Sequence, residues 1–338
     1  MGGKRKNPED AVLPPRVYRG KSKYEFHPAR GGAIILCPLS APISHVWTCY
    51  EKINNEPLEK ATLNKLTELF FHSADFCELA IETQKDYRKY ARRLLLVFGK
   101  MNPDNVRPEH VRKYMDKRGM SSRTQANREK TLLSRVYRWG YERGMVKSNP
   151  CTGVKQFKEP SRDRYITDEE YNALYSVSPL IVKAAMELAY LCCARQADVL
   201  ALEKSQLLER GIFIQQGKTG KKQIKAWIER LQQAIRTANE IKVRPGVNSI
   251  YVLHQSTGHR YTRDGFNSRW LKAKQLAANT FPELDFNFTF HDLKAKGISD
   301  LEGSLGEKQT ISGHKNITQT ARYDRKIEVV PVVGGQKK

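Results

Sequence analysis

Two stretches between residues 56 and 149 place apolar side chains at three- and four-residue intervals. The first consists of Tyr87, Tyr90, Ala91, Leu94, Leu95 and Phe98, and the second of Leu132, Leu133, Val136 and Trp139. This spacing puts each set on one face of an α-helix. We therefore expect a helical domain over residues 56–149, in which both stripes form the core and the second helix begins near Ser121.

The first 55 residues carry a different pattern. Tyr24 and Phe26 alternate with polar residues, and the apolar run from Ala33 to Leu36 directly follows the pair Gly31-Gly32. Alternation predicts half-buried strands, and paired glycines favour a tight turn. We expect a small β-sheet in this part of the chain.

Residues 165–330 mix both patterns. Thr167 and Glu170 have the spacing of a capping box, and a largely apolar helix is expected from about Leu180 to Ala194. Two short apolar runs, 211–215 and 225–228, flank a glycine-containing segment, which predicts a β-hairpin or small meander. From Arg230 onward the pattern is mostly helical.

Domain boundaries follow from these changes of pattern. The helical pattern stops at residues 147–150, and residues 153–164 are polar and unpatterned, as in an interdomain linker. A chain of 338 residues is also too long for one ordinary core. We predict a multidomain protein, mainly α with small β-sheets. Its expected parts are a β-rich domain 1–55, a helical domain 56–149, a linker 150–164, an α+β domain 165–326 and a tail 327–338.

The net charge of the chain indicates what kind of partner it binds. The chain has 59 Lys+Arg and 36 Asp+Glu, a formal net charge of +23. Positive charges in such excess repel one another in a folded protein, and a protein with this balance usually binds a polyanion. Nucleic acid is therefore the favoured partner. An anionic membrane is the weaker option, because no apolar run approaches the roughly 20 residues of a membrane span and no signal-peptide core is visible.

The six cysteines argue against metal or disulfide chemistry. They show no C-x-x-C spacing and no accompanying pair of histidines, and Cys192 and Cys193 fall in an apolar helix. We expect reduced thiols in a cytosol, and neither zinc nor any other cofactor.

Two groups of cations are candidate DNA contacts. Between Lys4 and Arg30, eight Lys/Arg face three acidic residues and are interleaved with Tyr18, Tyr24 and Phe26. Basic and aromatic residues on short strands suit contact with a DNA groove or backbone, although a merely solvated basic arm is the alternative. The polar face of the second helix is basic as well, and there phosphate contact is favoured over simple solvation. The DNA-binding candidates are Arg16, Arg19, Lys21, Lys23, Arg123, Arg128 and Arg135.

Six further residues are candidates for chemistry. Arg195 lies at the end of the apolar helix, and Asp198 three residues later shares its helical face and can orient the guanidinium toward a phosphate. In isolation each candidate also has a structural explanation: an ion pair for Arg195, a solvated hairpin tip for the lysine, a core or loop position for the histidines, and packing for the tyrosine. The remaining candidates are Lys218, His291, His314 and Tyr323.

Order and spacing favour the chemical interpretation. The chain carries Ala194-Arg195-Gln196-Ala197-Asp198, then Lys218-Thr219-Gly220, His291-Asp292-Leu293-Lys294 and Gly313-His314, with Tyr323 nine residues later. It also carries residues 258–262 (Gly-His-Arg-Tyr-Thr) before an expected helix. This series resembles the tyrosine recombinases, the phage integrase family of site-specific DNA strand exchangers. The resemblance covers residues 165–326 and extends more weakly to the helical domain and to residues 1–55, which are similar to an arm-type DNA-binding domain.

The resemblance implies a role for each matching residue. Tyr323 would attack the scissile phosphorus and form a 3′-phosphotyrosine link, leaving a free 5′-hydroxyl. Arg195 would hold the non-bridging oxygens, and Lys218 would protonate the departing 5′-oxygen. His291 and His314 would donate hydrogen bonds around the phosphate. Cations placed in advance would then replace a metal, and the covalent intermediate would make ATP unnecessary.

Two departures from the family pattern are visible. Lys294 stands where the family usually has a second arginine, so the charge is kept but the two-pronged grip on phosphate is lost. One lost charge-assisted hydrogen bond costs about 1.5–3 kcal/mol, which predicts a slowed rather than a dead enzyme. Cys193-Ala194 replaces the common Thr-Gly before the first arginine, which we expect to be harmless to the chemistry.

The resemblance also implies partners. We expect an integrase that inserts or excises a prophage or genomic island, with four protomers exchanging two duplexes through a Holliday junction in a bacterial cytoplasm. An excisionase or a host DNA-bending protein is a further expected partner. The apolar tail would dock on a neighbouring protomer or pack in cis. A DNA-binding regulator that lost catalysis and a type IB topoisomerase remain alternatives.

Overall fold

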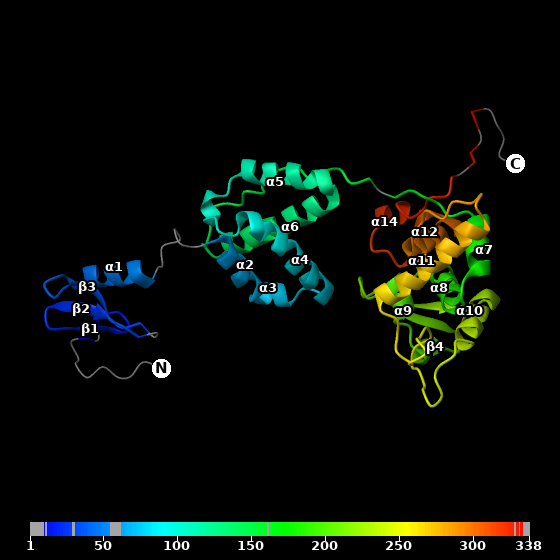
Figure 1. Cartoon of the computed structure of the whole chain (residues 1–338), viewed down its shortest axis with the longest axis horizontal. Helices are drawn as coiled ribbons and strands as arrows, with labels where there is room; N and C mark the ends of the chain where they lie inside the picture. Colours follow the sequence, from blue (N-terminus) through cyan, green and yellow to red (C-terminus); the bar gives the residue numbers. More distant parts are fainter. Residues whose placement is uncertain are drawn as a thin grey trace. The chain divides into compact units, whose positions relative to one another are not determined.

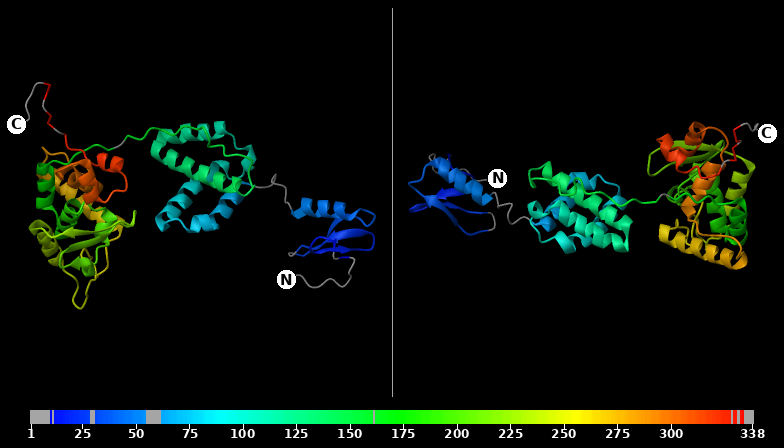
Figure 2. Two further views of the ribbon diagram at one scale, coloured as in Figure 1. Left: turned by 180° about the vertical axis from the view of Figure 1, so that it is seen from behind. Right: turned by 90° about the horizontal axis from the view of Figure 1, so that it is seen from above.

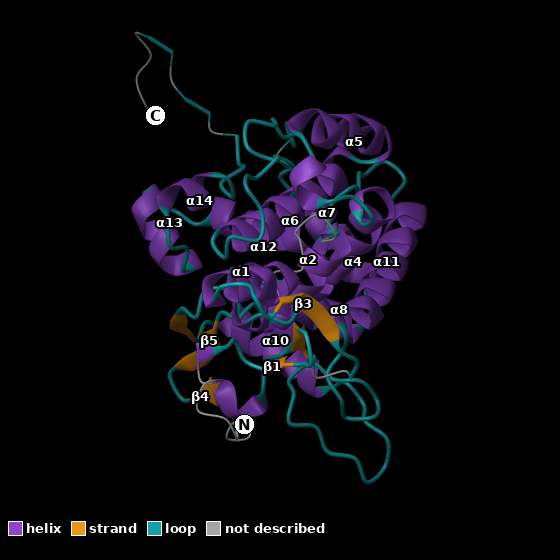
Figure 3. Cartoon of the chain, turned by 90° about the vertical axis from the view of Figure 1, so that its left-hand side faces the viewer, coloured by secondary structure: helices purple, strands orange, loops and turns teal. Residues whose placement is uncertain are grey.

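The computed structural model describes residues 10, 12–28, 31–54, 62–160, 162–327, 329–330 and 332–333. The chain divides into an N-terminal unit, Met1–Pro160, and a C-terminal unit, Ser161–Lys338. The buried apolar residues form three separate clusters, two in the first unit and one in the second. Figure 3 shows mostly helices with a few short strands. The predicted fold class, mainly α with small β-sheets, is confirmed.

The first cluster belongs to a three-stranded antiparallel sheet in the order β1-β2-β3, with α1 along one face (Figure 1 and Figure 2). Gly31 and Gly32 follow β2 with φ of 88° and 84°, a backbone region that favours glycine. The helix α1 was not expected from the sequence. The elements are β1 (Val17–Arg19), β2 (Lys23–Phe26), β3 (Ile34–Pro38) and α1 (Ile43–Asn54).

The aromatic residues of this sheet correct one expectation. Tyr24 is 3% exposed and Phe26 is 7% exposed, so both are core residues and neither can stack on DNA. Tyr18 is 49% exposed and packs edge-on against His27. The strand alternation that predicted the sheet also turns Tyr24 and Phe26 inward, because they are separated by two positions.

The second cluster lies among helices, and the two apolar stripes form it as predicted. Ser122 begins the last helix by accepting a hydrogen bond from the Gln125 amide at 3.3 Å, in agreement with the start expected near Ser121. The elements are α2 (Leu63–Phe71), α3 (Ala74–Cys77), α4 (Ile81–Phe98), the 3₁₀ turn η3 (Pro103–Asn105), α5 (Pro108–Ser121) and α6 (Arg123–Tyr141).

Part of the expected linker is fixed to these helices. The buried Asn127 side chain accepts a hydrogen bond from the Phe157 amide at 2.9 Å and donates to the Phe157 carbonyl at 2.8 Å. The Phe157 ring packs against the helical core. Residues up to Pro160 therefore group with the helices, and the division between the units follows Pro160.

The C-terminal unit is built around α8, which packs against α7, α10, α11 and α12 and is buried along nearly its whole length. The predicted capping box starts α7: the Thr167 amide donates to Glu170 at 3.0 Å and the reciprocal bond is 3.2 Å. The helices are α7 (Asp168–Val177), α8 (Leu180–Leu191), α9 (Gln196–Leu200), α10 (Glu229–Asn239), α11 (Arg263–Thr280), α12 (Phe290–Asp300), α13 (Leu305–Ser312) and α14 (Ile317–Ala321). A second antiparallel sheet contains β4 (Leu207–Leu208), β5 (Gly211–Gln215) and β6 (Lys222–Ala226), after the 3₁₀ turn η4 (Lys204–Gln206).

Three boundaries differ from the expectations. The apolar helix ends at Leu191, because Cys193 adopts a left-handed backbone with φ of 49°. That conformation costs a non-glycine residue roughly 1–2 kcal/mol. It falls on Cys193, at the family's threonine position, and Ala194, at the glycine position, does not have a positive φ. β6 begins at Lys222 rather than Lys225, since Gln215 and Lys222 already pair across the hairpin. Residues 240–262 form an irregular connection instead of continuing the helical pattern.

Within the described residues, no helix combines the length and apolar character needed to cross a membrane. In the same part of the chain, no group of three or more His, Cys, Asp or Glu side chains could hold a metal ion. The six cysteines are unpaired.

Candidate active site

Helix α12 presents two candidate residues in its first turns. Thr289 caps the helix, and the Asp292 carboxylate accepts hydrogen bonds from the Thr289 amide at 2.8 Å and its hydroxyl at 2.7 Å. His291 follows the cap at the surface, whereas Lys294 is 1% exposed. One helix start therefore fixes a histidine at the rim of the site and an ammonium group in its floor.

Tyr323 follows the short helix α14 and lies against α12. Its hydroxyl is 2.6 Å from His291 Nε2. The buried Ser299 binds the backbone on both sides of the ring: its hydroxyl donates to the Tyr323 carbonyl at 3.0 Å and accepts from the Arg325 amide at 2.7 Å. These bonds set the position of the phenol through its main chain.

Two ion pairs hold the same segment. The Arg325 guanidinium is 2.7 Å from the Asp292 carboxylate, and both side chains are buried. Lys308 is 2.7 Å from Asp324. Burial acts against ionisation of Asp292, but the Arg325 guanidinium and the Thr289 hydrogen bonds hold its pKa below the ordinary value. The nucleophile candidate is thus flanked by two fixed charges.

Arg195 enters the site from the N-terminus of α9. Its Nη1 donates to Gln216 Oε1 at 2.6 Å, while Asp198 lies at the limit of an ion pair, 4.0 Å away. Asp198 instead accepts a hydrogen bond from the Gly217 amide at 2.9 Å, in the turn of the β5–β6 hairpin. Asp198 is thus within ion-pair distance of Arg195, and Gln216 makes a second and shorter contact that the sequence did not predict.

His314 lies in the floor of the site. It follows Gly313, which ends α13 in the left-handed conformation with φ of 68°. Its Nδ1 is 3.2 Å from the Thr320 hydroxyl, and its Nε2 has no hydrogen-bond partner among the described residues. Burial, followed by the charges of Lys294 and Arg195, lowers the pKa of His314 to about 4. The imidazole is therefore neutral at physiological pH.

Lys294 is the second candidate residue of α12 and a buried cation. Its ammonium has no hydrogen-bond partner in the part of the chain that the structure describes, and it lies 5.9 Å from the centre of the Tyr323 ring. Burial, and then the Arg195 guanidinium, lower the pKa of Lys294 to about 8. A buried ammonium aimed into a site without an internal acceptor is suited to an anionic ligand.

The environment also shifts the pKa values of Tyr323 and His291, the two groups joined by the 2.6 Å hydrogen bond. Burial raises the pKa of Tyr323, and the Arg195 charge only partly opposes this. Desolvation lowers the pKa of His291, and the Lys294 charge acts in the same direction. The pair is therefore a neutral phenol facing a neutral imidazole that can accept its proton.

Among the described residues, Lys218 makes no hydrogen bond or ion pair with the other candidates. It is exposed in the turn between β5 and β6. The neighbouring Thr219 hydroxyl donates to Gln216 Oε1 at 2.9 Å, so the turn is tied to the residue that orients Arg195. The structure brings together Arg195, His291, Lys294, His314 and Tyr323.

Several residues that build the site carry no recognisable sequence signal. Gln216 follows an ordinary strand, and Ser299 and Arg325 lie in no recognised pattern. Asp292 lies within the motif His291–Lys294, but the family resemblance implies no role for it. Only a tertiary contact reveals these residues, because each acts on a partner more than 20 positions away.

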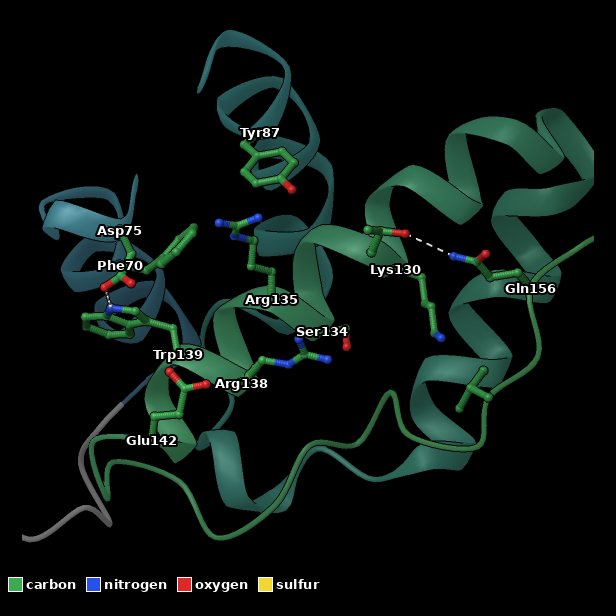
Figure 4. A pocket seen from close by; sticks show the side chains of 12 residues that line it. Phe70, Asp75, Tyr87, Lys130, Ser134, Arg135, Arg138, Trp139, Glu142 and Gln156 are labelled. Carbon is green, nitrogen blue, oxygen red and sulfur yellow. Dashed lines mark hydrogen bonds between the residues drawn. The ribbon is translucent and has the colours of Figure 1, made fainter. Parts of the chain in front are cut away.

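The predicted DNA contacts of the helical domain lie along α6. Arg135 stacks on Tyr87, with its guanidinium 5.9 Å from the ring centre, and lines a hollow of about 680 Å³ together with Lys130 and Arg138 (Figure 4). Arg128 pairs with Glu159 at 3.6 Å, and Arg123 lies 5.9 Å from the centre of the Phe157 ring. All three predicted arginines are exposed.

The predicted DNA contacts of the N-terminal sheet surround the β1–β2 hairpin. Arg16, Arg19, Lys21 and Lys23 are all exposed. Arg19 also forms an ion pair with Asp10 at 3.1 Å. Lys4 to Lys6 and Arg30, which contributed to the predicted basic cluster, lie outside the described residues.

Comparison with known proteins agrees with this geometry. Residues 164–328 match the phage integrase family. The integrase of Escherichia phage HK022 is 27% identical over 204 residues, and that of Escherichia phage lambda is 26% identical over 203 residues. Each alignment covers 57% of this chain and 56% of the relative, so the chain matches little more than half the length of these proteins.

Solved structures share the fold. A lambda integrase dimer bound to a COC′ core site has a TM-score of 0.69 and 18% identity, covering 95% of this chain and 98% of that one. The Tn1549 transposon integrase in complex with circular intermediate DNA has a TM-score of 0.64 and 16% identity, covering 78% and 94%. Through residues 164–328, this chain belongs to the phage integrase family, the tyrosine recombinases.

Proposed function

We propose that this chain is a site-specific DNA recombinase that cuts and rejoins DNA through a 3′-phosphotyrosine intermediate. The observation that carries the proposal is the Tyr323 hydroxyl, held 2.6 Å from a neutral His291 above the ammonium of Lys294, which has no hydrogen-bond partner within the described part of the chain. A phenol with a proton acceptor on one side and a buried cation below it is arranged to attack a phosphate.

The reaction follows from these positions. The Tyr323 oxygen attacks the scissile phosphorus while His291 Nε2 takes the phenolic proton. The bond from phosphorus to the 5′-oxygen breaks, and Lys218 donates the proton that this oxygen needs. Attack by a 5′-hydroxyl on the phosphotyrosine reverses the step and restores the phenol. The number of phosphoester bonds is conserved, so the cycle needs no nucleotide.

Charge on the phosphoryl oxygens is met by groups that are already in place. Arg195, oriented by Gln216, can hold non-bridging oxygens with its fork, and Lys294 adds a point charge from below. His314 Nε2, which no described residue contacts by a hydrogen bond, provides a third contact if it carries the proton, with Nδ1 accepting from Thr320. No cofactor enters this scheme.

We propose double-stranded DNA as the substrate, with core-type sites bound through the exposed cations of α6 and arm-type sites through those of the N-terminal sheet. Lambda integrase has been solved as a tetramer bound to a Holliday junction, which supports the same assembly here. In this proposal the chain integrates or excises a prophage or genomic island in a bacterial cytoplasm. An excisionase or host DNA-bending protein would set the direction.

The tail contributes to assembly in this scheme. Val329, Val330, Val332 and Val333 are all exposed, between 68% and 106%, whereas Pro331 lies outside the described residues. Exposed valines at a chain end suit docking on a neighbouring protomer. Truncation after Lys326 should then weaken tetramer formation on DNA, and unchanged assembly would favour packing in cis.

A nicked suicide site tests the function. The fragment beyond the cut diffuses away, so cleavage traps a covalent protein–DNA adduct that a denaturing gel resolves. We expect an adduct with the unmodified chain and none with Tyr323→Phe at equal DNA binding. Binding without an adduct would identify a regulator that has lost catalysis, and relaxation of plasmids lacking any site would identify a topoisomerase.

A further inference from the structure

The end of α13 is held by side chains of another element. Three consecutive carbonyl groups, those of residues 310–312, each accept a hydrogen bond from the β5–β6 hairpin. The donors are Gln223, Lys225 and Gln216, in that order. The first bond is 2.7 Å long and the third is 2.9 Å long.

This arrangement adds to the usual end of a helix, which is also present here, because the amide of the left-handed Gly313 donates to the Gln309 carbonyl at 2.9 Å. The last carbonyls of a helix have no partner within the helix and are normally satisfied by water or by the following backbone. Here the partners lie 86 to 96 positions away in the sequence. Lys225 also places a cation at the negative end of the helix dipole, and burial lowers its pKa. The hairpin therefore fixes where α13 ends.

The contact is close enough to exclude a side chain at the next position. A Cβ atom on Gly313 would lie 2.6 Å from Gln216 Nε2 and 2.7 Å from Gln223 Oε1. His314 comes directly after Gly313, and Gln309 of α13 donates to the His314 carbonyl at 3.1 Å. A shift of the hairpin would consequently move His314.

Gln216 extends the same connection to two other candidate groups. It is 5% exposed, and its Oε1 accepts hydrogen bonds from Arg195 at 2.6 Å and from the Thr219 hydroxyl at 2.9 Å. Thr219 adjoins Lys218 in the turn. One buried amide thus contacts the arginine, the lysine-bearing turn and the helix that leads to the histidine.

We propose that Gln216, Gln223 and Lys225 are positioning residues that hold Arg195, the turn bearing Lys218, and His314 in register around the phosphate. The inference rests on the proposed recombinase function and names residues of that reaction which carry no chemistry themselves. Misplacement of a reacting group by about 1 Å costs roughly 100-fold in rate, so loss of these bonds should slow cleavage without preventing DNA binding.

Single-turnover adduct formation on the suicide site, at saturating DNA, tests this role. Gln216→Met should slow the reaction about 100-fold, and Gln223→Met and Lys225→Met about ten-fold each, with DNA Kd within about three-fold of the unmodified chain. Lys225→Arg keeps a donor and a charge and should restore most of the rate. Gln215→Met and Lys222→Met, exposed positions of the same hairpin, are the matched controls and should react normally.

A second substrate separates positioning from general damage to the fold. When sulfur replaces the 5′-leaving oxygen, the thiolate departs without a proton, because a thiol has a pKa near 8.5. This substrate bypasses Lys218, so the defect of Gln216→Met should shrink about ten-fold relative to the oxygen substrate. Partial unfolding would lower both rates equally. If Gln216→Met does not fold, Gln223→Met, at a half-buried position, is tested in the same way.

The outcomes are distinct. Normal cleavage by Gln216→Met, or equal defects on the oxygen and sulfur substrates, would overturn this inference and leave the proposed function intact. Absence of any adduct from the unmodified chain would overturn the proposed function, and this inference with it.

Discussion

Several cations of the C-terminal unit are buried, whereas the arginines along α6 of the N-terminal unit are exposed. In the C-terminal unit, Lys294 and Lys296 are 1% and 2% exposed, and Arg325 is buried against Asp292. On α6 of the N-terminal unit, Arg128 and Arg135 are exposed. A buried charge must be paired or await a ligand, whereas a solvated charge needs neither and is screened by salt. Of the buried cations, Lys294 can therefore position one phosphate, whereas the exposed arginines of α6 can only attract many.

Helix α12 contains two buried lysines, Lys294 and Lys296, that differ in whether they have a carboxylate partner. Lys296 bonds Asp168 at 2.6 Å and Asp300 at 3.0 Å, and these bonds raise its pKa although burial opposes them. Lys294 has no such partner among the described residues, and its pKa is lowered to about 8. The paired lysine stabilises the fold, and the unpaired one faces the site.

The largest effect should come from breaking a buried pair. Asp292→Asn leaves Arg325 buried without its carboxylate and should lower the free energy of unfolding by about 3–5 kcal/mol. Glu229→Gln, which breaks the exposed pair with Arg236 in the same unit, should cost less than about 1 kcal/mol. Urea titration followed by circular dichroism measures both. Equal costs would remove the distinction between buried and exposed charge.

Restoring the family's arginine at position 294 should increase the contribution of the buried cation to cleavage. Lys294→Arg adds the two-pronged grip on phosphate and should raise the single-turnover cleavage rate about ten- to a hundred-fold, the equivalent of one charge-assisted hydrogen bond. Lys222→Arg, on the exposed face of the hairpin, is the matched control and should change nothing. A Lys294→Arg rate equal to that of the unmodified chain would contradict the role given to this position.

The pH profile distinguishes the titrating lysine from the arginine. Lys294 must be charged to hold phosphate, so the rate at subsaturating DNA should fall as pH rises through about 8 in the unmodified chain. The same rate should stay level in Lys294→Arg. Stability without DNA moves the other way: the cost of the buried ammonium is present below pH 8 and is relieved as pH rises toward the unfolded value. A level profile in both proteins would count against a charged Lys294.

The smallest effect should come from the exposed set. Arg135→Ala removes one phosphate contact, so it should weaken DNA binding several-fold at low salt and reduce the slope of log K against log salt by about 0.9. Cleavage at saturating DNA should be unchanged. Fluorescence anisotropy at several salt concentrations gives the slope. A slower reaction at saturating DNA would show that Arg135 takes part in cleavage and not only in DNA binding.

The sequence predicted those parts of the molecule that local pattern determines. The stripes of α4 and α6, the capping box at Thr167 and the spacing from Arg195 to Tyr323 all repeat within a few residues or match a family series. Periodicity also located the aromatic residues of β2, although it could not say that Tyr24 faces inward. Local pattern is enough where neighbours in sequence are neighbours in space.

The remainder depends on contacts between distant segments. Asp198 was expected to orient Arg195 because the two lie three residues apart, yet Gln216, 21 positions away, makes the short bond. The left-handed Cys193 shortened α8, and no propensity rule places a buried cysteine in that conformation. Packing decided both outcomes.

The most direct test of the account is to locate the covalent bond. Adduct from the suicide site would be digested with a protease and a nuclease, and the nucleotide-bearing peptide identified by mass spectrometry. We predict a 3′-phosphate ester on Tyr323 and no labelled peptide from Tyr323→Phe. A nucleotide on any other residue, or no modified peptide from an active preparation, would contradict the claim that fixed cations hold this phenol against DNA.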